Sequence, residues 1–187
     1  ANWDTAQTVT VTGVDDDLID GTQSTTMTIA VVDNSSDDSF DSLNDETVSV
    51  TTTDDDVAGF TIAETGGSTS VAESGTTDTF TVVLDAEPAS QVVLSVSSGD
   101  TGEATVHGST TSNTTLTFTS ANWDTPQSFT VTGADDNLID GSVSTALNVE
   151  VVQLVSDDNF DAVDDQTVSV TTTDNDVAGF TIAETGG

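Results

Sequence analysis

Apolar residues alternate with threonine and serine along most of this chain. Four segments show the alternation most clearly: QSFTVTG, DTFTVVL, TLTFTS and QTVSVTTT. A period of two residues is typical of half-buried strands. The β-branched residues Thr and Val dominate these segments, and helix-forming residues are sparse. Clusters of Gly, Asp, Asn and Ser interrupt them at the positions of turns. The pattern predicts an all-β protein.

One block of sequence occurs twice, 120 residues apart, without insertion or deletion. Aligning residues 1–67 with residues 121–187 gives 46 identities in 67 positions. A fixed period of this size indicates a tandem array of similar modules. We therefore predict the C-terminal half of one repeat in residues 1–57, a complete repeat in residues 58–177, and the first strand of the next in residues 178–187. Because the chain starts within a repeat, we expect it to be part of a longer array.

The complete repeat is expected to form a seven-stranded antiparallel immunoglobulin-like sandwich. Its expected strands are residues 59–64 with a continuation at 69–72, 78–84, 91–97, 104–106 with 115–119, 127–133, 142–155 and 166–173. A repeat of 120 residues is large enough to bury a core. Residues 1–57 would supply only the last three strands of the preceding module. We expect this segment either to borrow strands or to be loosely ordered.

The composition is extremely acidic. The chain has 34 Asp and Glu residues and no Lys or Arg, so its formal net charge is −34. Such acidity can indicate disorder, but the alternating apolar residues argue against it. Unbalanced charge destabilises a compact state, and a divalent cation is the expected counter-charge. Nucleic acid is excluded as a partner because phosphate binding needs basic side chains. No apolar segment is long enough for membrane insertion.

Acidic residues gather in the connections at one end of the expected sandwich. Consecutive strands run in opposite directions, so the first, third and fifth connections lie together with the end of the last strand. These positions hold eight carboxylates: Glu73, Asp100, Glu103, Asp135, Asp136, Asp140, Asp174 and Asp176. Oxygen ligands without His or Cys favour calcium, and about two or three ions could share the set. The alternative is a set of solvated loop Asp residues.

A family resemblance becomes specific at these motifs. The DDxxxDG motif of the fifth connection, the terminal Asp-x-Asp and the Val-Ala-Glu before the second strand resemble the Calx-β domain. The motifs of this chain resemble the repeats of very large bacterial surface proteins even more closely. The resemblance implies an immunoglobulin-like sandwich with calcium at one end. The ligands it implies are Glu73, Asp135, Asp136, Asp140, Asp174 and Asp176, with Asp100 as a further candidate. The first segment carries the matching half-set: Asp15, Asp16, Asp20, Asp54 and Asp56.

The expected function is structural. Residues 174–177 (DNDV) and 54–57 (DDDV) join successive repeats directly, so calcium bound there would stiffen a flexible linker. We predict extender modules of a large secreted or cell-surface adhesin, with neighbouring repeats as partners and a distal binding region held away from the cell. Two alternatives are an extracellular filament that exchanges strands between copies and an adhesive module that binds a glycan or ice. No catalytic motif is recognisable, so no enzyme activity is expected.

Overall fold

The computed structural model describes residues 2–108 and 114–186. Contacts between residues divide the chain into two units, Ala1–Asp56 and Val57–Gly187. Both units are built from β-strands with short 3-10 helices, so the predicted all-β class is confirmed. No helix in these residues is long and apolar enough to cross a membrane.

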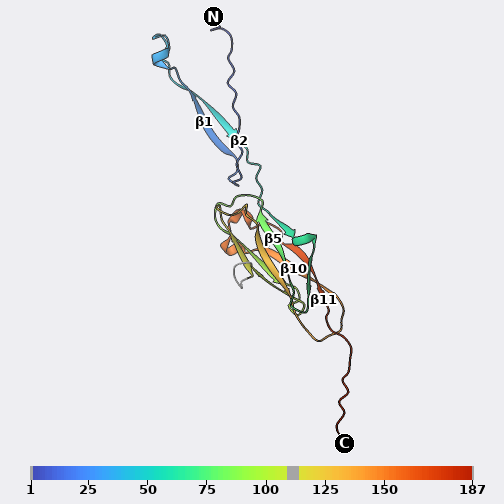
Figure 1. Ribbon diagram of the computed structural model, residues 1–187. Coiled ribbons are helices and arrows are strands. Elements are labelled where there is room, and N and C mark those ends of the chain that lie inside the picture. The colour runs from blue at the N-terminus through green and yellow to red at the C-terminus, as the bar shows by residue number, and fades with distance from the viewer. Residues whose placement is uncertain (1, 109–113, 187) are drawn as a thin grey trace. The chain divides into compact units, whose positions relative to one another are not determined.

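The second unit is a β-sandwich of two sheets (Figure 1). One sheet has the strand order β3 (Phe60–Glu64), β5 (Thr77–Leu84), β9 (Gln127–Gly133) and β7 (Ala104–Gly108). The other has the order β4 (Thr69–Ala72), β11 (Gln166–Thr173), β10 (Val143–Val151), β6 (Val92–Ser98) and β8 (Thr115–Phe118). Neighbouring strands are antiparallel except for β4 and β11, which are parallel.

Two of the seven expected strands are each divided between the sheets. The first divides at η2 (Thr65–Gly67), where Gly66 and Gly67 have φ values of 73° and 86°. Glycine adopts such positive values without strain. The chain then crosses from β3, which pairs with β5, to β4, which pairs with β11. The fourth expected strand divides into β7 and β8. The described part of the second unit therefore has nine strands rather than seven, and one pair is parallel.

The core follows the predicted alternation of apolar and polar residues. Along β10, Leu147 and Val149 are buried and the residues between and beside them face outward. Phe80 of β5 and Phe129 of β9 pack in the core with ring centroids 5.4 Å apart. The connection from β10 to β11 contains η3 (Gln153–Val155) and η4 (Asp158–Phe160), and it inserts the fully buried Phe160. Each such ring contributes roughly 1.5–3 kcal/mol through burial.

The first unit contains one antiparallel hairpin in its described residues. It is formed by β1 (Gln23–Ile29) and β2 (Glu46–Thr52), with η1 (Asp33–Ser35) between them. Residues 7–13, the counterpart of β9, form no strand although a third strand was expected. The reason is that β9 pairs with β5 and β7, whose counterparts lie outside residues 2–56. Residues 178–186, expected as a first strand, likewise form none.

Candidate metal centre

The parallel pair β4 and β11 places two carboxylates side by side. These strands pair Ala72 with Thr173, and the next residue of each is acidic: Glu73 after β4 and Asp174 after β11. The backbone N–H of Glu73 donates to the carbonyl of Thr173 at 3.1 Å, which continues the pairing beyond the strands. Both side chains therefore start from one point on the edge of the sheet.

Glycine at position 133 brings a third segment to the same place. A Cβ atom on Gly133 would collide with the backbone of Ala72, so only glycine lets the end of β9 approach β4 this closely. The next residue, Ala134, donates its N–H to the carbonyl of Glu103 at 2.8 Å. This bond joins the connection after β9 to the connection before β7. Asp136 and Glu103 are thereby brought to the end of β4.

Five acidic residues form two groups that share Glu73. Oxygen atoms of Glu73, Asp174 and Asp176 lie within 4.8 Å of one another, and so do those of Glu73, Glu103 and Asp136. Glu73 is 1% exposed and Glu103 is 7% exposed. One oxygen of Glu103 (Oε2) and one of Asp176 (Oδ2) are buried without a hydrogen-bond partner in the described structure. A buried charge without a partner is costly, and a bound cation would compensate it.

The electrostatic strain of these groups is visible in the pKa values of two carboxyls. Burial raises the pKa of Glu103, and the charges of Asp140 and Asp100 add to the effect. Burial also raises the pKa of Asp176, with repulsion from Asp174 as the next cause. Both causes disfavour the ionised form, and a nearby cation would oppose them. The chain has no Lys or Arg that could supply this positive charge.

Backbone N–H groups partly stabilise the negative charge of the carboxylates at the end of β11. Asp174 accepts hydrogen bonds from the N–H of Asp176 at 2.6 Å and of Gly141 at 2.8 Å, and these bonds lower its pKa. Glu73 accepts one from the N–H of Asn175 at 3.1 Å. That bond lowers the pKa of Glu73, but burial and the surrounding carboxylates raise it by more. Asp174 is therefore held ionised beside a glutamate whose charge is disfavoured.

Three of the predicted ligands lie near these groups but belong to neither. Asp100, Asp135 and Asp140 have exposed side chains. Asp100 accepts a hydrogen bond from the N–H of Gly102 at 2.9 Å, and Asp135 accepts one from the Asn175 side chain at 3.1 Å. Of the residues implied as ligands, the structure thus brings together Glu73, Asp136, Asp174 and Asp176.

Glu103 is the acidic residue whose importance the sequence underestimated. It was counted among the eight carboxylates, but the family resemblance did not include it among the ligands. In the structure its backbone carbonyl accepts hydrogen bonds from Ala134 and from the hydroxyl of Thr172. These bonds hold Glu103 between the sheets, so its side chain is buried beside Glu73. Its position after Gly102 in an acidic loop was the one available signal.

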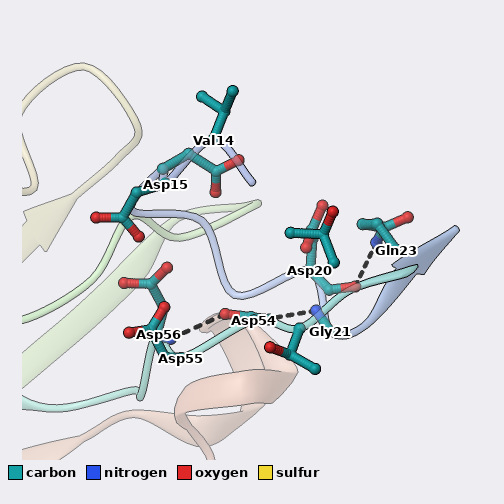
Figure 2. A pocket seen from close by; sticks show the side chains of 11 residues that line it. Val14, Asp15, Asp20, Gly21, Gln23, Asp54, Asp55 and Asp56 are labelled. Atoms are coloured by element: carbon teal, nitrogen blue, oxygen red, sulfur yellow. Dashed lines mark hydrogen bonds between the residues drawn. The ribbon is translucent and has the colours of Figure 1, made fainter. Parts of the chain in front are cut away.

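The half-set of the first unit repeats the loop geometry. Asp54 accepts hydrogen bonds from the N–H of Gly21 at 2.6 Å and of Asp56 at 2.8 Å (Figure 2), as Asp174 does from its counterpart partners. These bonds lower the pKa of Asp54, with that from Asp56 as the larger cause. The other predicted residues line the same pocket: Asp15, Asp16 and Asp20.

The first unit lacks the two buried glutamates. In the second unit Glu73 follows β4 and Glu103 precedes β7, and both therefore belong to residues 58–120. Residues 1–56 correspond in sequence to residues 121–176 only. Neither group of converging carboxylates includes a residue of the first unit, within the described residues. The first unit therefore carries only part of the set of acidic residues that the second unit brings together.

No protein-family model matches the chain, and no curated protein sequence matches it. Solved structures are similar at low levels. Domains 4 and 5 of the S-layer protein SbsC are 20% identical, with 69% of this chain and 63% of that one covered and a TM-score of 0.39. The apo form of the Calx CBD1 domain is 13% identical, with 65% of this chain and 100% of that one covered and a TM-score of 0.44. The E. coli chaperone DraB is 7% identical, with 66% of this chain and 59% of that one covered and a TM-score of 0.43. This chain therefore spans 63% of the length of the S-layer domain pair. Similarity at this level leaves function to be argued from the residues.

Proposed function

We propose that residues 58–177 form a calcium-binding structural module. One observation carries the proposal: a buried carboxylate oxygen of Glu103 has no hydrogen-bond partner in the described structure, inside a group of carboxylates. The chain has no Lys or Arg to neutralise that group. Calcium binds six to eight oxygen ligands in flexible geometry, and it would supply positive charge where these side chains supply oxygen.

The sharing of Glu73 supports a centre for two ions. One would be held by Glu73 with Asp174 and Asp176, and the other by Glu73 with Glu103 and Asp136, because these are the groups whose oxygens converge. Asp100, Asp135 and Asp140 would add negative charge or further ligands from the rim. Backbone carbonyls and water would complete the coordination.

We further propose that the chain carries parts of three such modules in tandem, divided at 1–57, 58–177 and 178–187. The repeat of 46 identical residues in 67 supports this division. Asp174 and Asp176 are at once candidate ligands and the link to the next module, so calcium would fix the chain where it leaves β11. A rigid link suits an extender in a large secreted or cell-surface adhesin. The cell-surface location rests on the resemblance of the motifs to bacterial surface repeats.

Calorimetric titration of single-residue variants tests the metal centre. Asp136→Ala removes a carboxylate from one of the converging groups and should weaken calcium binding at one of the two sites. Asp158→Ala is the matched control, because Asp158 is exposed in η4, in the connection at the other end of β10. Equal losses in the two variants would show that acidity in general, rather than this centre, attracts the ion.

A further inference from the structure

An aspartate followed by a glycine is a place where a protein backbone rearranges readily, and the chain has two such dipeptides: Asp20–Gly21 and Asp140–Gly141. The backbone nitrogen of the glycine attacks the side-chain carboxyl carbon of the aspartate. A C–N bond forms, and the amide hydrogen leaves with the carboxyl OH as water. Glycine favours the attack because it has no side chain in the way and a permissive backbone. Water then opens the resulting succinimide ring at either carbonyl, which gives aspartate again or isoaspartate.

The Asp140–Gly141 dipeptide is accessible in the folded chain. Both residues are exposed, in the connection between β9 and β10. Gly141 has a φ of 76°, and a Cβ atom at this position would meet nothing within 4 Å beyond its chain neighbours. In the described structure, therefore, neither burial nor crowding keeps the glycine nitrogen away from the aspartate side chain.

One hydrogen bond opposes the rearrangement. The N–H of Gly141 donates to Oδ2 of Asp174 at 2.8 Å. Asp174 is itself fixed at the end of β11, because its other carboxylate oxygen accepts from the N–H of Asp176 at 2.6 Å. To attack, the glycine nitrogen must lose this proton and turn toward Asp140. A hydrogen bond to an ionised carboxylate is a strong one, and it opposes both steps.

We propose that Asp140–Gly141 is a site of isoaspartate formation that the hydrogen bond to Asp174 protects. The first unit repeats the arrangement, because the N–H of Gly21 donates to Oδ2 of Asp54 at 2.6 Å (Figure 2). Once the protecting bond is lost, isomerisation inserts the side-chain CH2 group into the main chain. The connection between β9 and β10 then becomes one atom longer, and the free carboxylate of residue 140 is the former main-chain carboxyl group.

Incubating the whole chain in EDTA at neutral pH tests the protection without relying on the proposed calcium function. Isoaspartate is detected with an isoaspartyl methyltransferase and a labelled methyl donor. It is located with a protease that cuts before aspartate but not before isoaspartate. Asp174→Ala removes the acceptor for the N–H of Gly141 and should accelerate isoaspartate formation at Asp140 by about 10- to 100-fold. The unsubstituted chain should form isoaspartate much faster in urea than in buffer.

The chain supplies matched controls for this variant. Asp20–Gly21 keeps its hydrogen bond to Asp54 and should not react faster in the Asp174→Ala variant, whereas Asp54→Ala should accelerate this dipeptide alone. Val149→Ala destabilises the second unit by removing a fully buried side chain, but it leaves Asp174 in place. It should therefore leave the rate at Asp140 close to that of the unsubstituted chain, at a temperature where urea titrations show every variant to be folded.

The two dipeptides and the core variant make the outcome decisive. Isoaspartate at Asp140 in Asp174→Ala and at Asp20 in Asp54→Ala, each without the other, supports the proposal. No acceleration at Asp140 in Asp174→Ala, or an equal acceleration in Val149→Ala, would overturn it. So would isoaspartate that forms in the folded unsubstituted chain as fast as in urea. Because every arm contains EDTA, these results bear on the protection alone, whereas equal melting in calcium and EDTA would overturn the proposed function alone.

Discussion

Removing calcium with a chelator should lower the free energy of unfolding of the second unit. The size of the loss follows from the number of ions that its two groups of carboxylates would bind. An ion that binds only the native state stabilises it by about 4 kcal/mol when its concentration is a thousandfold above Kd. Two groups converge, so two ions would contribute about 8 kcal/mol. A module of about 120 residues unfolds with an entropy near 0.25 kcal/mol/K. Removing one ion should therefore lower Tm by about 16 °C, and removing both by about 30 °C.

Differential scanning calorimetry in millimolar calcium and in EDTA measures this shift. The two solutions need matched ionic strength, because salt alone screens the repulsion within a chain of net charge −34. Glu73→Gln should abolish most of the shift, since both groups share Glu73, whereas the control Asp158→Ala should retain it. Equal midpoints in calcium and EDTA would refute the assignment of these carboxylates to a metal centre.

Three further predictions concern the core, the pH dependence and the array. Phe160→Ala should lower the free energy of unfolding of the second unit by about 3–5 kcal/mol because this ring is fully buried. Phe40→Ala, at the exposed counterpart in the first unit, should change the free energy of unfolding of the chain by less than about 0.5 kcal/mol. Equal losses in urea titrations of the two variants would contradict the assigned burial. In EDTA, Tm should rise as the pH falls from 7 toward about 5. The raised pKa values of Glu103 and Asp176 make the folded state bind more protons than the unfolded chain. A Tm that falls over this pH range would disprove this prediction. In small-angle scattering in calcium, the maximum dimension should increase by roughly 40–50 Å for each module added, from two repeats to four. The distribution of distances should be broader in EDTA. An array that folds back on itself in calcium would rule out the extender role.

Strand positions were predictable wherever the period-two pattern is bounded by turns. The ranges 69–72, 127–133 and 166–173 coincide with β4, β9 and β11 as the structure has them. Both divided strands were predicted in two pieces, but the sheet that each piece joins was not predictable. Which sheet a segment joins depends on partners far away in sequence, and a single sequence does not reveal them.

Residues 7–13 show most clearly where reasoning from sequence stops. They match β9 closely in sequence, yet they form no strand. A strand needs hydrogen-bonding neighbours, and those of β9 belong to residues 58–120. The same context decides the site. Strand directions predicted which loops converge, but only the loop backbone determines that Glu103 is buried while Asp135 and Asp140 point to solvent.

The parallel pairing of β4 with β11 has a mechanical consequence for any array of these modules. A stretching force enters the sandwich through β3 and β4 and leaves it through β11. Since β4 and β11 are parallel neighbours, the force slides them past each other and loads their hydrogen bonds together instead of unzipping them one by one. Glu73 and Asp174 stand at the ends of these two strands, so calcium between them would bridge the load-bearing pair. The force needed to extend such an array would then depend on the calcium concentration of the surrounding solution.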